Sequence, residues 1–242
     1  MGNCQIVDLG LIDYAEAYAL QKRVVAARKA GMVENVLLLC EHPPVITQGR
    51  NGKREHLLVS ESVLRQRNVE FFETSRGGDI TYHGPGQLVG YPILQLGEIR
   101  KDVVWYVRML EEAMIGTTAE SGIAAFRVEG RTGIWVTAAD GQEEKLGAIG
   151  VHISRWVTSH GFAYNVSTDL RYFDFIVPCG IAGRKATSLE KVLGRTVKVS
   201  AVAQQIARHF GEVFGLEMQE SSRGALLERL EHAGQAAEVV FS

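Results

Sequence analysis

The sequence of 242 residues has little of several features that would narrow its class at once. Its three cysteines, Cys4, Cys40 and Cys179, are too few for a disulfide framework and are not spaced like a zinc motif. No apolar run approaches the roughly 20 residues of a membrane-spanning helix, and the N-terminal residues lack the pattern of a signal peptide. The formal net charge of -2 excludes a general attraction to nucleic acid or to acidic membranes. We therefore expect a cytoplasmic protein that uses no metal and has neither nucleic acid nor membrane as a partner.

The length and composition of the chain are enough to bury one large core or two modest ones. Hydrophobic residues make up 46% of the chain, and helical and strand patterns mix along it without a repeat or a linker. Consecutive strands joined by short turns, such as a hairpin turn at Asp140-Gly141, favour antiparallel pairing. We therefore predict an α+β fold with a mixed or antiparallel sheet flanked by helices. We expect one domain over residues 1–215 and a peripheral C-terminal helix or tail over residues 216–242. The predicted helices cover residues 14–30, residues 102–121 and a segment capped by Ser200; the predicted strands cover residues 35–41, 69–73, 88–94, 134–137, 145–153 and 160–166.

The most informative segment runs from Arg76 to Gln87 and reads RGGDITYHGPGQ. Four glycines and a proline exclude a regular helix or a central strand. A buried strand pattern follows immediately, so a polar, glycine-rich loop is anchored to the core at its C-terminal end. This arrangement is typical of the wall of a binding site, although a plain surface turn has the same composition.

Three other places could carry chemistry. Cys179 stands between a proline and a glycine, whereas Cys4 and Cys40 lie in apolar strand patterns typical of small core residues. Lys145 begins an apolar, glycine-containing strand, where it is either a solvated strand end or a charge directed into a site. His160 lies in a third segment. The sequence is compatible with either a catalytic or a structural role for His160 and for His83 in the glycine-rich loop.

Several segments together resemble one family. The motif RGGxxTYHxxGQ at residues 76–87, followed by Tyr91, is similar to the signature of the octanoyltransferases of lipoate synthesis. The motif KLGAIG at residues 145–150, HGFAxN at residues 160–165 and PCGI at residues 178–181 also match, in the same order. The resemblance covers residues 5 to 215 and departs from the usual pattern at Tyr164, where the family has leucine.

The resemblance implies a fold like the catalytic domain of biotin and lipoate protein ligases, and a specific reaction. An octanoyl or lipoyl group passes from acyl carrier protein to a lysine of the lipoyl domains of 2-oxo acid dehydrogenases or of glycine cleavage H protein, without a cofactor. In this family the residue matching Cys179 carries the acyl group as a thioester, and the residue matching Lys145 lowers the pKa of its thiol. We expect the enzyme to act as a monomer. The residues expected to line the acyl pocket are Arg76, Gly77, Gly78, Asp79, Ile80, Thr81, Tyr82, His83, Ala148, Ile149, Gly150, Gly161, Phe162 and Ala163.

Two alternatives remain open from the sequence. Lipoate and biotin ligases share the implied fold, but they activate a free acid with ATP and use a lysine without a covalent cysteine. A non-catalytic scaffold that binds carrier or lipoyl domains is the second alternative. The presence of both Cys179 and Lys145 argues against each, because neither function has a use for the pair.

An acidic carrier needs a local basic surface, because the chain as a whole is slightly negative. Arg50, Lys53 and Arg54 fall in one hydrophilic loop and are the predicted docking patch. A solvated run of charges is the alternative interpretation of this loop.

Overall fold

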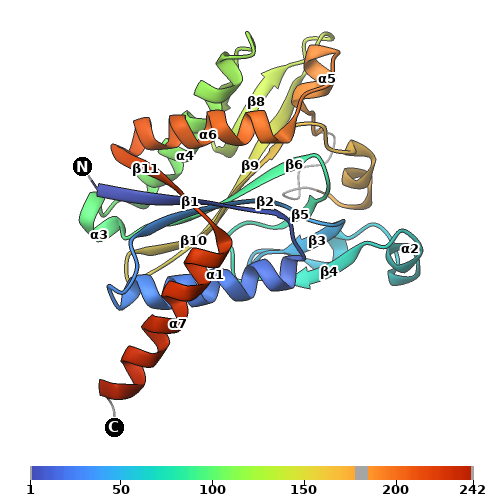
Figure 1. Cartoon of the computed structure of the whole chain (residues 1–242). Helices are drawn as coiled ribbons and strands as arrows, with labels where there is room; N and C mark the ends of the chain where they lie inside the picture. The colour runs from blue at the N-terminus through green and yellow to red at the C-terminus, as the bar shows by residue number, and fades with distance from the viewer. Residues whose placement is uncertain (1, 178–184, 241–242) are drawn as a thin grey trace.

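The structure, a computed structural model, describes residues 2–177 and 185–240, with side chains described as far as residue 233. Its frame is a mixed sheet of eight strands (Figure 1). These strands are β1 (Gly2–Leu11), β2 (Asn35–Glu41), β6 (Gln87–Ile93), β7 (Phe126–Val128), β8 (Arg131–Thr137), β9 (Glu143–Ser154), β10 (Val157–Asn165) and β11 (Leu216–Ser221). Their order across the sheet is β11-β1-β2-β6-β10-β9-β8-β7.

The pairing confirms the predicted α+β class. Strand β1 pairs in parallel with β2 and with β11, and the pairs from β2 through β6, β10, β9 and β8 to β7 are antiparallel. The consecutive strands β7, β8, β9 and β10 are joined by short turns, as antiparallel neighbours allow. The turn between β8 and β9 is the predicted one, with Gly141 at a φ of 82°.

Helices cover both faces of the large sheet, as Figure 1 shows. Helices α1 (Tyr14–Lys29) and α7 (Arg223–Val240) cover one face, and α4 (Val103–Ala119) and α6 (Val199–Phe214) cover the other. Strand β2 is buried on both sides: Val36, Leu38 and Cys40 pack with α1, whereas Leu37 and Leu39 pack with α4 and α6. Among the described residues, no helix is both long enough and apolar enough to cross a bilayer.

A smaller sheet supports the glycine-rich segment. It consists of β3 (Val45–Gln48), β4 (Glu70–Glu73) and β5 (Ile80–His83) in the order β4-β3-β5. Strand β5 lies at an edge, which agrees with the exclusion of a central strand there. Short helices complete the described chain: α2 (Glu61–Gln66), α3 (Leu96–Ile99), α5 (Leu189–Leu193) and the 3-10 turns η1 (Arg54–His56) and η2 (Leu170–Phe175).

Two sequence expectations need correction. Helix α6 begins at Val199, with Lys198 rather than Ser200 at the capping position. The C-terminal segment is more than a helix or tail, because its first residues form β11 at the edge of the large sheet. Most side chains of β11 are exposed, which is why the sequence of this strand is typical of a surface segment. Leu216 is nevertheless buried, and Met218 packs closely on Gly211.

Candidate active site

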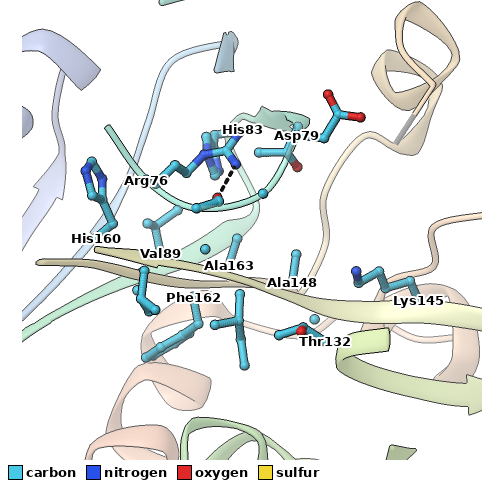
Figure 2. A pocket seen from close by; sticks show the side chains of 18 of the residues that line it. Arg76, Asp79, His83, Val89, Thr132, Lys145, Ala148, His160, Phe162 and Ala163 are labelled. Atoms are coloured by element: carbon cyan, nitrogen blue, oxygen red, sulfur yellow. Dashed lines mark hydrogen bonds between the residues drawn. The ribbon is translucent and has the colours of Figure 1, made fainter. Parts of the chain in front are cut away.

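A cavity of about 490 Å³ lies between the large sheet and the glycine-rich segment. Its floor is formed by β6, β10 and β9, where Val89, Ala163 and Ala148 pair side by side. Its roof is the segment from Arg76 to His83. Figure 2 shows His160 at one end and Lys145 at the other, with Ala163 and Ala148 between them. Small floor side chains leave an elongated space of the size that ligand pockets have.

Glycines allow the roof to lie directly on its neighbours. A Cβ on Gly150 would stand 2.9 Å from the carbonyl oxygen of Gly77, and one on Gly49 would stand 2.4 Å from that of Gly78. The backbone N–H of Gly77 donates to the Val151 carbonyl at 2.9 Å, which ties the roof to β9. Close backbone approach is therefore the physical reason for the glycines in this region.

The structure brings nearly all of the predicted pocket residues to this cavity. Those that line it are Arg76, Gly77, Gly78, Asp79, Ile80, Thr81, His83, Ala148, Ile149, Gly150, Gly161, Phe162 and Ala163. Tyr82 does not line it: its ring stacks on Tyr172, with centroids 4.9 Å apart, in the core of the small sheet. Neighbouring side chains of a strand point to opposite faces, so Thr81 and His83 reach the cavity and Tyr82 turns away.

Lys145 lines the cavity at the end opposite His160. Its Nζ lies 5.2 Å from the centroid of the Trp135 ring. Gly133, at a φ of 111°, makes room for this side chain, because a Cβ there would stand 2.8 Å from the Lys145 Cε. Neither Gly133 nor Trp135 was a predicted site residue, because their contact depends on the irregular register between β8 and β9.

Residues 185–187 lie directly against Lys145. The Lys145 N–H donates to the Lys185 carbonyl at 3.0 Å, and the Thr187 N–H donates to the Lys145 carbonyl at 2.9 Å. Lys185 and Ala186 also line the cavity. The predicted nucleophile, Cys179, belongs to residues 178–184 and lies outside the described residues. Cys4 and Cys40 are buried core residues, as predicted, and burial raises the pKa of the Cys4 thiol to about 12.

The two histidines of the cavity are neutral near pH 7. Burial lowers the pKa of His83 to about 3, aided by the proximity of His42 and Arg76. Burial also lowers the pKa of His160 to about 3, with Arg76 and His152 as further causes. His160 has a φ of 55°, and its ring stacks on Tyr18. An uncharged imidazole whose pKa lies near 3 is poorly suited to proton transfer at neutral pH.

Three buried polar residues next to the cavity were missed as site residues: Thr47, Gln87 and Asn165. Gln87 Oε1 lies 2.7 Å from His83 Nδ1, and Gln87 Nε2 donates to Asn165 Oδ1 at 2.8 Å. Gln87 begins one apolar strand and Asn165 ends another, which is a signal that could have identified them. Thr47 gave no such signal, because β3 was not predicted.

A second hollow of about 440 Å³ borders the cavity at His160, which lines both. It is lined by Lys22, Lys29 and Arg155 and by no aspartate or glutamate among the described residues. Partial burial, and then the charge of Arg155, lowers the pKa of Lys29. Partial burial, and then the charges of Arg50 and Lys29, lowers the pKa of His152. We call Lys22, Lys29 and Arg155, together with Arg50 near His152 at its border, the cationic groove. Its positive potential suits an acidic partner.

Comparison with known proteins identifies the class to which this fold and site belong. Residues 13–211 match the family model of the lipoyl protein ligase A/B catalytic domain, and the chain belongs to that family. Among solved structures, a bipartite lipoate protein ligase from Thermoplasma acidophilum superposes with a TM-score of 0.76 over 98% of this chain and 92% of that one, at 15% identity. A biotin protein ligase from Aquifex aeolicus superposes with a TM-score of 0.52 over 89% and 71% of the two chains, at 14% identity. These likenesses confirm the predicted fold.

Sequence relatives narrow the class to one branch. An octanoyltransferase from Solibacter usitatus is 52% identical over 218 residues, which cover 90% of this chain and 96% of that protein. An octanoyltransferase from Acidobacterium capsulatum is 53% identical over 220 residues, covering 87% of this chain and 89% of that protein. The chain is thus a member of the octanoyltransferases, a family of acyltransferases, as its motifs predicted.

Proposed function

We propose that the protein transfers an octanoyl group from acyl carrier protein to a lysine of a lipoyl domain, through a thioester on Cys179. The acceptors are the lipoyl domains of 2-oxo acid dehydrogenases and glycine cleavage H protein, and the reaction is the first step of protein lipoylation within the cell. The proposal is supported by the position of Lys145 at one end of an elongated cavity with an apolar floor. The chain that forms this cavity is 52% identical to an octanoyltransferase.

The chemistry has two balanced steps. The Cys179 thiolate attacks the carbonyl carbon of the octanoyl thioester, and the carrier leaves as its own thiolate. The acceptor lysine amine then attacks the acyl-cysteine, an amide forms, the amine loses a proton and the Cys179 thiolate returns. Exchange between thioesters is nearly thermoneutral and amide formation is downhill, so ATP is not consumed.

Lys145 activates the nucleophile in this scheme. A free thiol has a pKa of about 8.5, so only a small fraction is ionised near neutral pH. An ammonium about 4 Å away stabilises the thiolate by up to roughly 4 kcal/mol at an effective dielectric constant of about 20. This is enough to lower the thiol pKa by about one to three units. The backbone contacts of Lys145 with Lys185 and Thr187 support this role, because residues 185–187 continue the segment that contains Cys179.

The cavity supports an acyl chain rather than a nucleotide-sized polar group. Val89, Ala148 and Ala163 present only hydrocarbon to its middle. The roof above them is closed by backbone contacts from Gly77 to Val151. An extended fatty acyl chain fits such a channel, with its carbonyl carbon toward Lys145 and its methyl end toward His160.

The carrier surface is proposed to be the cationic groove. In the patch predicted from the sequence, Lys53 pairs with Glu55 at 3.5 Å and Arg54 pairs with Glu61 at 2.9 Å, so two of its three charges have partners. Arg50 instead lies near His152, where its charge adds to the lowering of the His152 pKa by burial. An acidic carrier would relieve the mutual repulsion of the groove cations, and this favours docking there.

The test of the proposed function is transfer without ATP. Purified protein is mixed with octanoyl-loaded carrier protein and an unmodified lipoyl domain, and the mass of the lipoyl domain is followed. We expect one octanoyl group per domain with ATP absent, and no stimulation by added ATP. Transfer of free octanoate that requires ATP would contradict the proposal and indicate a ligase. Binding of both proteins without any transfer would indicate a scaffold.

A further inference from the structure

Six buried residues form a chain of hydrogen bonds from the roof of the cavity to the backbone beside Lys145. The Arg76 guanidinium donates to Thr47 Oγ1 from Nε at 3.2 Å and from Nη2 at 3.0 Å. Thr47 Oγ1 lies 3.4 Å from His83 Nε2, and His83 Nδ1 lies 2.7 Å from Gln87 Oε1. Gln87 Nε2 donates to Asn165 Oδ1, and Asn165 Nδ2 donates to the Thr187 carbonyl at 2.9 Å. All six residues are more than nine-tenths buried: Arg76, Thr47, His83, Gln87, Asn165 and Thr187.

The two ends of this chain fix its direction. A guanidinium can only donate, and a backbone carbonyl can only accept. Asn165 must therefore turn its NH₂ group to Thr187 and its oxygen to Gln87. Gln87 must then present its oxygen to His83, which requires a proton on His83 Nδ1. The hydroxyl of Thr47 completes the chain by donating to the unprotonated His83 Nε2.

One histidine state satisfies every member. Doubly protonated His83 would direct an N–H at the Thr47 hydroxyl, which already accepts from Arg76. The other neutral tautomer would place a lone pair on Nδ1 against the Gln87 oxygen. Each wrong state therefore leaves polar atoms without a matching partner in this chain, and at this depth of burial such mismatches cost free energy. Both nitrogens of His83 are thus occupied in holding the chain.

The chain ends at the backbone that holds Lys145. The Asn165 side chain donates to the Thr187 carbonyl, and the Thr187 N–H donates to the Lys145 carbonyl at 2.9 Å. Ala186, between Lys185 and Thr187, bridges Lys145 in parallel pairing. A displacement of Asn165 would release residues 185–187 from β10 and loosen their pairing with the backbone of Lys145.

We propose that His83, Gln87 and Asn165 are positioning residues for the acyl transfer, which hold residues 185–187 against Lys145 through a chain that only the Nδ1-protonated tautomer of His83 completes. The proposal rests on the proposed function, since it assigns these residues to the same site. In this proposal His83 gives and takes no proton during turnover.

The decisive variants are His83→Asn and His83→Leu. The Asn amide nitrogen occupies the place of Nδ1 and still donates to Gln87, but it does not titrate; leucine removes the donor and keeps similar bulk. We expect His83→Asn to keep kcat within about fivefold of the parent with the same pH profile. We expect His83→Leu and Asn165→Ala to lower kcat roughly tenfold to a hundredfold, with the KM for the octanoyl-carrier substrate within about twofold. Each variant is assayed at a temperature where circular dichroism shows it fully folded.

Tyr164→Phe is the matched control. Tyr164 is the neighbour of Asn165 on β10, and its hydroxyl makes a buried hydrogen bond of 2.8 Å with Thr118 on the opposite face of the sheet. We expect this variant to lose stability without losing kcat. If His83→Asn is as inactive as His83→Leu and one limb of its pH profile disappears, His83 is a proton-transfer residue and the proposal is overturned. Equal kcat in all fully folded variants would also overturn it.

A second readout does not depend on activity. Amide hydrogen exchange at Lys145 and Thr187, whose N–H groups make the strand bridge, is compared between the parent and Asn165→Ala. We expect faster exchange at both amides in Asn165→Ala and unchanged exchange there in Tyr164→Phe. Unchanged exchange in Asn165→Ala would contradict the positioning role. Failure of the parent to transfer octanoate would instead count against the proposed function alone.

Discussion

Strand β10 presents two buried faces with opposite uses. On one face Tyr164 fills the core against α4, and its hydroxyl bonds to Thr118. On the other face Ala163 and Asn165 border the cavity. All three β10 residues are at most 6% exposed. The three side chains are equally buried but differ in size and polarity. The large Tyr164 side chain packs in the core, whereas the small Ala163 leaves room in the cavity and the Asn165 amide bonds to Gln87 and Thr187.

Substitutions on the core face of β10 should therefore alter stability, and substitutions that face the cavity should alter turnover. The largest effect is expected at Lys145. Lys145→Ala should raise the pKa of the Cys179 thiol and lower the acylation rate at pH 7 roughly a hundredfold, with partial recovery at alkaline pH. Lys145→Arg should not restore the rate fully, because a planar guanidinium differs in shape and does not release a proton. Single-turnover acylation from pH 6 to 10 measures this, and an equal loss at every pH would contradict it.

Filling the middle of the cavity should have the next largest effect. Ala163→Leu and Ala148→Val add bulk between the two ends, where Figure 2 shows both side chains on the floor. We expect kcat/KM for the octanoyl substrate to fall about tenfold to a hundredfold, and that for a butyryl substrate to fall less. Tyr164→Phe should cost about 1 kcal/mol in the free energy of unfolding and leave both ratios unchanged. Equal losses for both chain lengths would mean that the acyl chain does not occupy this space.

The buried histidines should make stability depend on pH. In the unfolded chain a histidine has a pKa of about 6.5, and in the folded protein the pKa of His83 and of His160 is about 3. Between these values the unfolded state binds more protons, so stability is complete above about pH 6.5 and falls as the pH drops toward 3. The expected slope is about 1.4 kcal/mol per pH unit for each histidine.

Urea unfolding at pH 5, 6 and 7 measures this slope. His83→Asn should reduce it by one histidine's share, whereas Tyr164→Phe should shift stability equally at all three pH values. A slope in His83→Asn equal to that of the parent would show that His83 is not the buried neutral group described above.

The smallest effect is expected at the cationic groove. Reversing Lys29, Arg50 and Arg155 to Glu should raise the KM for the carrier substrate severalfold and weaken its dependence on salt. The control reverses Lys53 and Arg54, which already pair with Glu55 and Glu61 and should matter less. A larger effect of the control pair would indicate that the carrier docks on the loop of Lys53 and Arg54 instead. An effect on the KM for the lipoyl domain alone would indicate that the groove binds the lipoyl domain.

Local patterns predicted much of this molecule. The strand at residues 35–41 and the turn at Gly141 follow from periodicity and turn chemistry, and the glycine-rich segment does form the cavity roof. Contacts between distant segments were not predictable in this way. Strand β11 pairs with β1 from the other end of the chain, and Tyr82 turns away from the cavity because of the small sheet that supports it. The bond from Gln87 to Asn165 joins residues 78 positions apart.

A covalent acyl-enzyme on Cys179 would be heavier than the free protein by one octanoyl group, which intact mass spectrometry detects. The parent is incubated with octanoyl-loaded carrier protein without ATP or acceptor, and the adduct is mapped by peptide mass. We predict one octanoyl group on Cys179, labile to hydroxylamine as a thioester is, and no adduct together with loss of most turnover in Cys179→Ser. Transfer by Cys179→Ser at the parent rate, or an adduct on Cys4 or Cys40, would contradict the account.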